Sequence, residues 1–277
     1  MSSEIILNEA LFNRAKALKL HGVVSHWEKV YNSDWIENLI LWEETTRAHR
    51  SLERRLHQSN IGPFKALTQF DWSWPKKCDR ETIEELMQLR FITDATNVIL
   101  CGPNGVGKST IAKNIAYLAI MDGLTALFTT ASNMLNDLAG QDGDNAMSRR
   151  IKHYVQPHLL IVDEVGYLSY SNRHADLLFE IISKRYQHKP TIITTNKPFA
   201  EWNQIFPNAS CVVSLLDRLV HHSEIISIEA ESFRLKEATA RSLQRQQERR
   251  QRKSKEKINT NAEEVRDDSP ATERTLS

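Results

Sequence analysis

Cys101-Gly102-Pro103-Asn104-Gly105-Val106-Gly107-Lys108-Ser109-Thr110 matches the pattern G-x-x-x-x-G-K-[ST] at every fixed position. This stretch decides the fold, because its glycines let the backbone turn so that N–H groups point inward. Together with the positive end of the following helix, those groups can hold phosphate oxygens. The pattern therefore predicts a phosphate-binding loop in which all of 102–110 contacts a nucleotide. A glycine-rich turn without a ligand does not require the Lys108-Ser109 pair.

Two side chains of this loop have separate expected roles. Lys108 is predicted to reach the β- and γ-phosphates of ATP, and Ser109 to ligate Mg²⁺. The flanks suit the motif, since Asn97-Val98-Ile99-Leu100 is typical of a buried parallel strand. The helix after the loop is expected to bury one apolar stripe, made of Ile111, Ile115, Leu118 and Ala119.

A second chemical stretch is Leu159-Leu160-Ile161-Val162-Asp163-Glu164, an apolar strand that ends in two carboxylates. An apolar strand that ends in two carboxylates is common by itself. Here it follows the phosphate loop by one α/β repeat, so the phosphate-binding half and the metal-binding half of one site are both present. Ligands bind at this end of strands in open α/β sheets. Asp163 is predicted to hold Mg²⁺ through its water shell, and Glu164 to orient and deprotonate the attacking water.

Two further side chains are candidates for the same site. Asn196 ends the next predicted strand, where its amide would lie beside Glu164, and a plain strand-end cap is the alternative. Arg218 follows an apolar segment at the edge of a predicted helix. It could complete a neighbouring subunit's site as an arginine finger. An intrahelical salt bridge explains Arg218 equally well.

Composition excludes several classes of protein. The 36 lysines and arginines nearly balance the 35 acidic residues, so any attraction to a polyanion must be local. Cys78, Cys101 and Cys211 share no C-x-x-C spacing, which argues against a zinc site or a disulfide scaffold and favours a reducing cytoplasm. The sequence has neither a long apolar run nor a charged-then-apolar leader, so we expect no membrane insertion and no export.

Residues 1–62 predict a small all-helical N-terminal domain. A helix that starts near Asp34 places Arg47, Arg50 and Arg54 on one face, at spacings of three and four. That face could lie along a duplex DNA backbone. It could equally be a solvated face, because the segment holds about as many acidic residues as basic ones.

Residues 63–80 are predicted to be a linker, and residues 241–277 a basic and then acidic tail that is disordered. The linker contains Phe70-Asp71-Trp72-Ser73-Trp74-Pro75, for which packing on its own domain is favoured over stacking on a nucleobase. Residues 234–257 hold ten basic and three acidic residues, which suits either a phosphate-contacting tail or a solvated helix.

Strand and helix patterns alternate over residues 81–240. The expected strands are 98–101, 125–129, 158–163, 191–195 and 224–228, and the principal helices are 108–121 and 174–187. This alternation predicts an α/β fold whose parallel strands are covered on both faces.

Taken together, the motifs resemble the IstB-like family of AAA+ ATPases, the transposition helper proteins of insertion sequences, which are related to DnaC-like helicase loaders. The resemblance runs from about residue 5 to 245. Besides the phosphate loop it rests on Phe70-Asp71-Trp72, Asp163-Glu164-Val165-Gly166-Tyr167-Leu168, Phe179, Arg185-Tyr186, Thr194-Thr195-Asn196-Lys197-Pro198-Phe199, Trp202, Asp217-Arg218-Leu219 and Ser232-Phe233-Arg234.

This resemblance implies a P-loop AAA+ core with a five-stranded parallel sheet in the order 5-1-4-3-2, which uses ATP and Mg²⁺. It implies that Asn196 is the first sensor of the nucleotide, Arg218 the arginine finger and Arg234 a second sensor that also contacts the nucleotide.

The same resemblance implies an ATP-dependent DNA-binding ATPase that forms a homo-oligomer on duplex DNA and assists a partner transposase. The alternative is a DnaC-like replicative helicase loader, and an adjacent integrase-type transposase gene would separate the two. A P-loop small-molecule kinase is a third hypothesis. It lacks an evident acceptor site and leaves Asp217-Arg218-Leu219 without a role.

Overall fold

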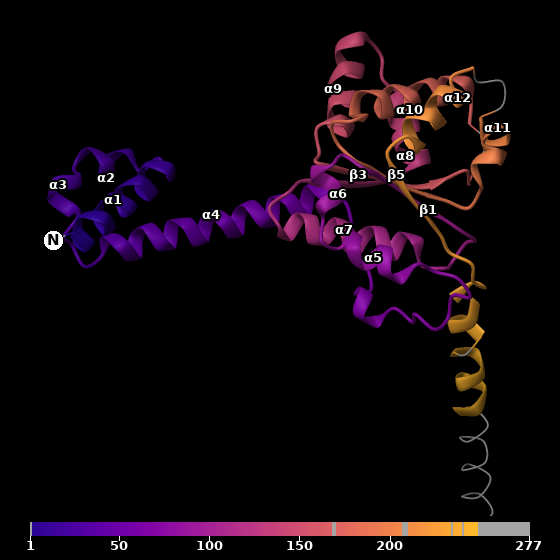
Figure 1. Cartoon of the computed structure of the whole chain (residues 1–277), viewed down its shortest axis with the longest axis horizontal. Coiled ribbons are helices and arrows are strands. Elements are labelled where there is room, and N and C mark those ends of the chain that lie inside the picture. The colour runs from indigo at the N-terminus through magenta and orange to yellow at the C-terminus, as the bar shows by residue number, and fades with distance from the viewer. Residues whose placement is uncertain (1, 168–169, 207–209, 234, 240, 249–277) are drawn as a thin grey trace, which may run out of the picture.

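The centre of the chain is a five-stranded parallel sheet in the order β2-β3-β4-β1-β5 (Figure 1). The computed structural model describes residues 2–167, 170–206, 210–233, 235–239 and 241–248. Its strands are β1 (Asn97–Cys101), β2 (Ala126–Thr130), β3 (Leu159–Val165), β4 (Thr191–Thr195) and β5 (Ser223–Ser227). Read from the other edge, the order is 5-1-4-3-2. The predicted α/β fold and strand order are confirmed, and each predicted strand overlaps the observed one.

The register of the sheet brings the candidate site residues to one edge. β1, β3 and β4 are apolar and largely buried, as expected for strands covered by helices on both faces. Leu100 pairs with Thr194, and Val162 pairs with Ile193. Because the strands run in the same direction, the phosphate loop after β1 and the polar ends of β3 and β4 meet at their carboxyl ends.

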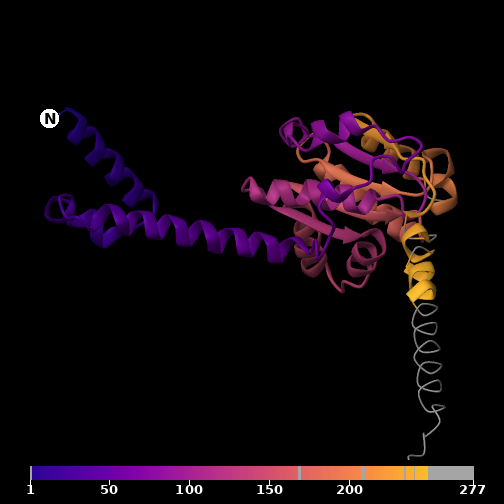
Figure 2. The ribbon, with the colours of Figure 1, turned by 90° about the horizontal axis from the view of Figure 1, so that it is seen from below.

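Helices cover both faces of the sheet (Figures 1 and 2). One face carries α8 (Ala131–Ala139), α9 (Asp144–Val155), α10 (Asn172–Arg185) and α12 (Val212–Val220), around a core that includes Leu160, Val162 and Ile193. The other carries α5 (Arg80–Leu86), α6 (Arg90–Thr93) and α7 (Lys108–Met121), around Val98, Leu100 and Ile161. The short elements are η1 (Leu67–Gln69), η2 (Phe199–Glu201) and α11 (Trp202–Ile205).

The helix after the phosphate loop, α7, buries a different face from the predicted one. Ile111, Ile115 and Ala119 are fully buried, but Leu118 is 37% exposed, so its placement in the stripe was wrong. α7 packs against the sheet and also against α4, so its buried face differs from the predicted stripe. The observed face includes small residues, which allow close approach of the helix. The added buried positions are Ala112, Ala116 and Ile120.

The N-terminal helices form a small bundle away from the sheet (Figure 1). It consists of α1 (Ser2–Ala17), α2 (His21–Ser25), α3 (Trp27–Val30) and the first turns of α4 (Ile36–Ser59). Leu11, Ala15, Ile36 and Ile40 are its buried core. Arg14 strengthens it by donating to both carboxylate oxygens of Glu44, at 2.9 and 2.7 Å.

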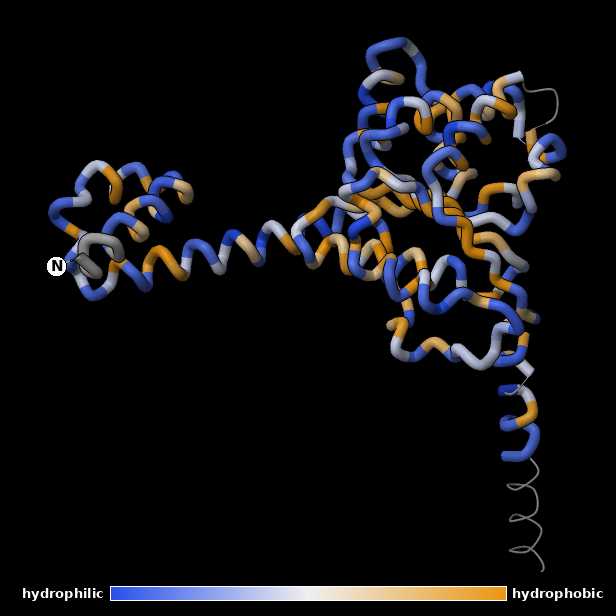
Figure 3. Tube along the Cα trace, in the orientation of Figure 1, coloured by the Kyte–Doolittle hydropathy of each residue, from blue (hydrophilic) through white to orange (hydrophobic). Residues whose placement is uncertain are grey.

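The long helix α4 belongs to two cores. Its first turns complete the bundle, whereas Leu52 and Leu56 near its end pack against the sheet domain, next to α7 and β2. Residues 45–50 between them are exposed on every side, as in a polar helix that bridges two domains (Figures 2 and 3). In the described ranges, neither α4 nor another helix is long and apolar enough to cross a membrane.

Arg185 joins α9, α10 and the beginnings of β3 and β4 from inside the core. Its guanidinium is 1% exposed, and burial lowers its pKa to about 9, so it is protonated at neutral pH. It donates to carbonyl oxygens at the carboxyl end of α9, which have no N–H donor within that helix. It donates to Thr191 Oγ1 and to the carbonyl oxygens of Tyr154, Val155, Pro157, His158 and Pro190, at 2.6 to 3.4 Å.

We expect Arg185→Met to lower the free energy of unfolding by about 3 to 5 kcal/mol, because it leaves several buried carbonyls unpaired. Arg185→Lys is the matched control. It keeps the positive charge but offers one ammonium group where the planar fork offered five donors, so its loss should be smaller. Urea unfolding followed by tryptophan fluorescence measures both. A loss below about 1 kcal/mol in the methionine variant contradicts the assignment.

Candidate nucleotide-binding site

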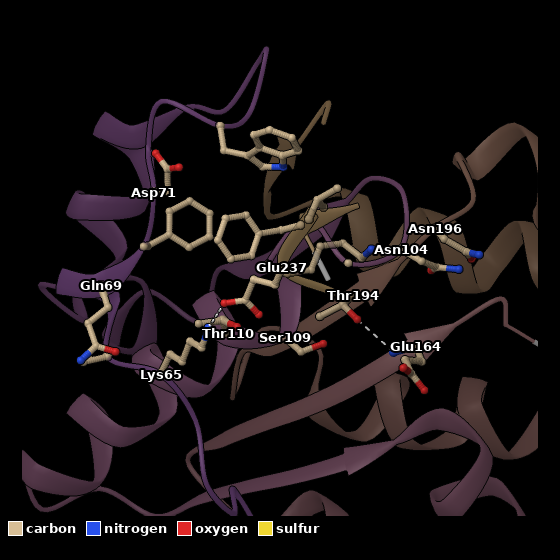
Figure 4. A pocket seen from close by; sticks show the side chains of 18 of the residues that line it. Lys65, Gln69, Asp71, Asn104, Ser109, Thr110, Glu164, Thr194, Asn196 and Glu237 are labelled. Carbon is tan, nitrogen blue, oxygen red and sulfur yellow. Dashed lines mark hydrogen bonds and ion pairs between the residues drawn. The ribbon is translucent and has the colours of Figure 1, made fainter. Parts of the chain in front are cut away.

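A pocket of about 300 Å³ lies over the phosphate loop, at the carboxyl ends of the central strands (Figure 4). The loop forms one wall with residues 104–110, and the strand ends contribute a second wall. The third wall comes from the linker before β1 and from the segment after β5. Outside the loop, the lining residues are Lys65, Ala66, Gln69, Phe70, Asp71, Trp74, Glu164, Tyr167, Thr194, Asn196, Phe233 and Glu237.

The phosphate loop has the geometry that its glycines predict. Gly107 has a φ of +102° directly before α7, so the helix starts at Lys108 and its first residues line the pocket. A Cβ on Gly107 would lie 2.4 Å from the Phe70 ring, so a side chain fits neither the backbone nor the space. Lys108 is buried, and its ammonium donates to Gly102 O at 2.6 Å and Pro103 O at 2.7 Å. The loop thus holds this cation in the pocket wall.

Asp163 lies beside Ser109, as the two halves of a metal–phosphate site require. Asp163 is 5% exposed, and Ser109 Oγ donates to its Oδ1 at 2.9 Å. These oxygens fit Mg²⁺, which at phosphate sites takes one or two protein ligands and completes its shell with phosphate and water oxygens. The described residues contain no group of three or more acidic, histidine or cysteine side chains placed to hold a metal.

Glu164 has an unusual backbone. Its φ is +62°, in the left-handed region that non-glycine residues rarely adopt, and the β3–β4 register shifts between Val162 and Val165. This irregularity turns the Glu164 side chain out of the sheet, where it is exposed and lines the pocket. Its N–H donates to Thr194 Oγ1 at 2.9 Å, and that hydroxyl donates in turn to Asp163 Oδ1. The sequence does not indicate this role of Thr194, because nothing about a residue in a buried strand shows which side chains it will contact.

Asn196 lines the pocket directly after β4. Its Oδ1 is buried and lacks a hydrogen-bond partner among the described residues. A buried amide oxygen without a partner is unfavourable unless water or a ligand reaches it. This suits a side chain that positions a water molecule, and the sensor role of Asn196 stays a prediction.

Arg218 lies on α12 outside the pocket lining, and its partners are on the neighbouring helix α10. Its guanidinium stacks over the Phe179 ring at 4.6 Å from the centroid and donates to Ser183 Oγ. In the described part of the chain, these contacts with α10 hold Arg218, and it forms no salt bridge within α12. A residue outside its own subunit's pocket is compatible with action on a neighbour's.

The linker and the segment after β5 lie together over the loop. Phe70 and Trp74 line the pocket, and Phe70 also packs against Trp72 at 4.8 Å between centroids. Trp74 Nε1 donates to Glu231 O at 3.0 Å, and Phe233 N donates to Gly105 O at 3.1 Å. The aromatic linker therefore both packs on its own domain and forms a pocket wall.

Two charged contacts close the same side of the pocket. Lys65 in the linker and Glu237 after β5 form an ion pair, with 2.5 Å between Nζ and Oε1. The Lys236 ammonium lies over the Trp74 ring, 3.9 Å from the centroid. Because these segments are far apart in the sequence, no local pattern could have predicted their pairing. Arg234, the expected second sensor, lies outside the described residues, as does most of the predicted tail 241–277.

The three arginines proposed for DNA contact lie along the exposed middle of α4. Arg47 Nε donates to Glu43 at 2.8 Å and its Nη1 to Leu18 O at 2.5 Å, so it helps to join α4 to the bundle. Arg50 and Arg54 are exposed one and two turns further along. A contact between this face and DNA stays a prediction.

The sheet order, the phosphate loop and the carboxylates at the end of β3 define a P-loop protein of the AAA+ class. The fold is similar to that of AMPPCP-bound DnaA from Aquifex aeolicus, with a TM-score of 0.52, 18% identity and coverage of 62% of this chain and 52% of that chain. More particularly, the chain belongs to the family described as IstB-like ATP binding protein, whose model matches residues 11–241.

Relatives of the chain come from bacterial insertion sequences. It is 35% identical over 205 residues to a protein of insertion sequence IS5376 from Geobacillus stearothermophilus, which covers 74% of this chain and 82% of the relative. It is 36% identical over 191 residues to a protein of IS21 from Pseudomonas aeruginosa, covering 69% of this chain and 72% of the relative. Both relatives are named for ATP binding. The resemblance stated from the motifs is confirmed.

Proposed function

We propose that this chain binds and hydrolyses ATP, assembles as a homo-oligomer on duplex DNA, and assists a partner transposase. The observation that supports the ATP chemistry is that Lys108, Ser109 and Glu164 line one pocket, while Asp163 lies behind its wall and accepts a hydrogen bond from Ser109. The insertion-sequence relatives support the transposase as partner, and favour it over a replicative helicase.

Binding would begin with an exchange of partners in the loop. The Lys108 ammonium, now held by two carbonyls, turns to the β- and γ-phosphate oxygens of ATP, while the N–H groups at the start of α7 face the same phosphates. Mg²⁺, when bound, supplies positive charge against those oxygens. Ser109 and Asp163 are the residues that would hold it.

Hydrolysis would follow from the placement of the strand-end side chains. Glu164 accepts a proton from the attacking water, and Asn196, whose Oδ1 lacks a hydrogen-bond partner among the described residues, orients that water. Arg218 of a neighbouring subunit offsets charge that develops on the γ-phosphate. The last step requires an oligomer, because Arg218 lies outside its own subunit's pocket.

The division of labour along the chain is part of the proposal. Residues 1–62 would be the helical N-terminal domain, which carries the arginines proposed to contact DNA, 63–80 the linker, 81–240 the ATPase domain and 241–277 a basic and then acidic tail. α4 connects these functions, since one helix contacts both the bundle and the sheet domain.

The proposal predicts duplex binding that is independent of sequence, stronger with ATP, and salt-dependent. Each phosphate contact contributes about 0.9 to the slope of log affinity against log salt concentration. An Arg47, Arg50 and Arg54 triple alanine variant should therefore flatten the slope, by up to ~2.7 if all three arginines contact phosphates. Fluorescence anisotropy of a labelled duplex, with and without a non-hydrolysable ATP analogue, measures affinity and slope.

A matched control removes three other positive charges, with Lys77, Arg80 and Lys184 changed to alanine. All three are exposed and lie in surface ion pairs of the sheet domain, so their loss should leave the slope nearly unchanged. If the α4 variant binds duplex with wild-type affinity and slope, that helix face is only solvated. DNA would then contact another part of the chain.

A further inference from the structure

A buried hydroxyl connects the two carboxylate residues at the end of β3. Thr194 is fully buried on β4, next to β3 in the sheet. Its Oγ1 accepts the Glu164 N–H at 2.9 Å (Figure 4). The same hydroxyl donates its own proton to Asp163 Oδ1. The hydroxyl has a single proton, which it donates to Asp163, so it can only accept from the Glu164 N–H. The two hydrogen bonds together fix the position of the Asp163 carboxylate and of the Glu164 backbone.

The Glu164 backbone needs such a contact. Its φ of +62° is unfavourable for a residue with a Cβ, and such a conformation persists only where the surrounding structure stabilises it. The shift in register between Val162 and Val165 removes regular pairing to β4 at this point. The hydroxyl of Thr194 therefore takes the place of a β4 carbonyl as acceptor for the Glu164 N–H.

Asp163 depends on the same residue. Ser109 and Thr194 both donate to Oδ1 of Asp163. If Ser109 becomes a metal ligand, its hydroxyl is drawn away from that carboxylate. The Thr194 hydroxyl then remains as the donor that holds the orientation of Asp163.

We propose that Thr194 is a positioning residue for ATP hydrolysis: it sets the Asp163 carboxylate and the Glu164 backbone in one arrangement, so that metal binding and water activation are aligned. This inference rests on the proposed ATPase function. Thr194 acts through its two partners and needs no contact with ATP. If it were simply a buried β-branched residue that fills space, valine, which has the same shape, would replace it without loss.

The decisive variants are Thr194→Val, which keeps shape and removes the hydroxyl, and Thr194→Ser, which keeps the hydroxyl and removes the methyl. Thr194→Ala removes the hydroxyl without any possible clash, and serves if the valine variant does not fold. Thr191→Val is the matched control on the same strand. Its hydroxyl accepts from Arg185 at the far end of β4, so the variant should lose stability and not turnover.

Three measurements on the full chain separate positioning from packing. The rate of phosphate release at saturating MgATP should fall ~10–100-fold in Thr194→Val, because mutation of a residue that hydrogen-bonds to a metal ligand typically has an effect of this size. The rate should stay close to that of the wild type in Thr194→Ser. Titration with a fluorescent ADP analogue without Mg²⁺ should give similar affinities in all variants. Mg²⁺ titration of the complex with a non-hydrolysable ATP analogue should show weaker Mg²⁺ binding in Thr194→Val and Thr194→Ala, and wild-type binding in Thr194→Ser and Thr191→Val.

A readout without nucleotide tests the geometry itself. Amide hydrogen exchange over 159–167 should accelerate in Thr194→Val and Thr194→Ala, because the Glu164 N–H loses its acceptor, and remain slow in Thr194→Ser and Thr191→Val. Wild-type exchange, turnover and Mg²⁺ affinity in Thr194→Val would overturn the inference. So would a serine variant as impaired as the valine one. A wild-type chain that does not hydrolyse ATP contradicts the proposed function instead, and the exchange and Mg²⁺ results still decide the role of Thr194.

Discussion

Glu164→Gln is expected to slow ATP hydrolysis by ~10²–10⁴-fold while ATP remains bound, because a general base contributes about that much and acts in the transition state. Glutamine keeps the size of the side chain and the backbone N–H to Thr194, so the pocket should retain its shape. A phosphate-release assay gives turnover, and equilibrium titration with a fluorescent ATP analogue gives affinity. Turnover at the wild-type rate would remove the mechanism.

Two control variants separate a loss of nucleotide binding from a loss of hydrolysis. Lys108→Ala should abolish nucleotide binding, since Lys108 contacts phosphates already in the ground state. Glu201→Gln makes the same chemical change at a carboxylate that pairs with Lys197 at 2.7 Å and does not line the pocket, so turnover should persist. Loss of binding in Glu164→Gln would show that Glu164 supports the bound state rather than the reaction.

Arg218→Ala should lower turnover by ~10³–10⁵-fold, the range of arginine fingers, while a single subunit still binds ATP. In this structure the guanidinium lies against Phe179 and Ser183 on α10, away from its own pocket. Its loss should therefore affect hydrolysis and ATP-dependent assembly together. Arg218→Lys keeps the charge without the planar fork, and most of the activity should still be lost.

Mixing the Arg218→Ala and Lys108→Ala proteins tests action between subunits. In a ring or filament some interfaces then combine an intact Arg218 with an intact phosphate loop, so a fraction of activity should return. Size-exclusion chromatography with a non-hydrolysable ATP analogue measures assembly of each protein. The trans role is wrong if no mixture recovers activity and Arg218→Ala assembles normally.

Much of the fold and the loop could be predicted because the responsible signals are local. A phosphate loop needs consecutive residues, and its glycines and Lys108 act within a few positions of one another. A central parallel strand needs a short apolar run, which places Asp163 and Glu164 at its end with little ambiguity. The same logic failed for Leu118, because which face of a helix is buried depends on every neighbour and not only on the sheet.

The sequence by itself determined the class of fold, the strand order through family resemblance, and the candidate residues for binding phosphate and metal. Each of these depends on short-range patterns or on a series of motifs in chain order. Only the tertiary structure decided that Thr194 joins Asp163 to Glu164, that Glu164 adopts a left-handed backbone, and that Phe70 and Phe233 share a pocket wall. These contacts join segments that are remote in the sequence, and a hydrogen bond or a packed ring depends on distances that folding sets and residue spacing does not encode.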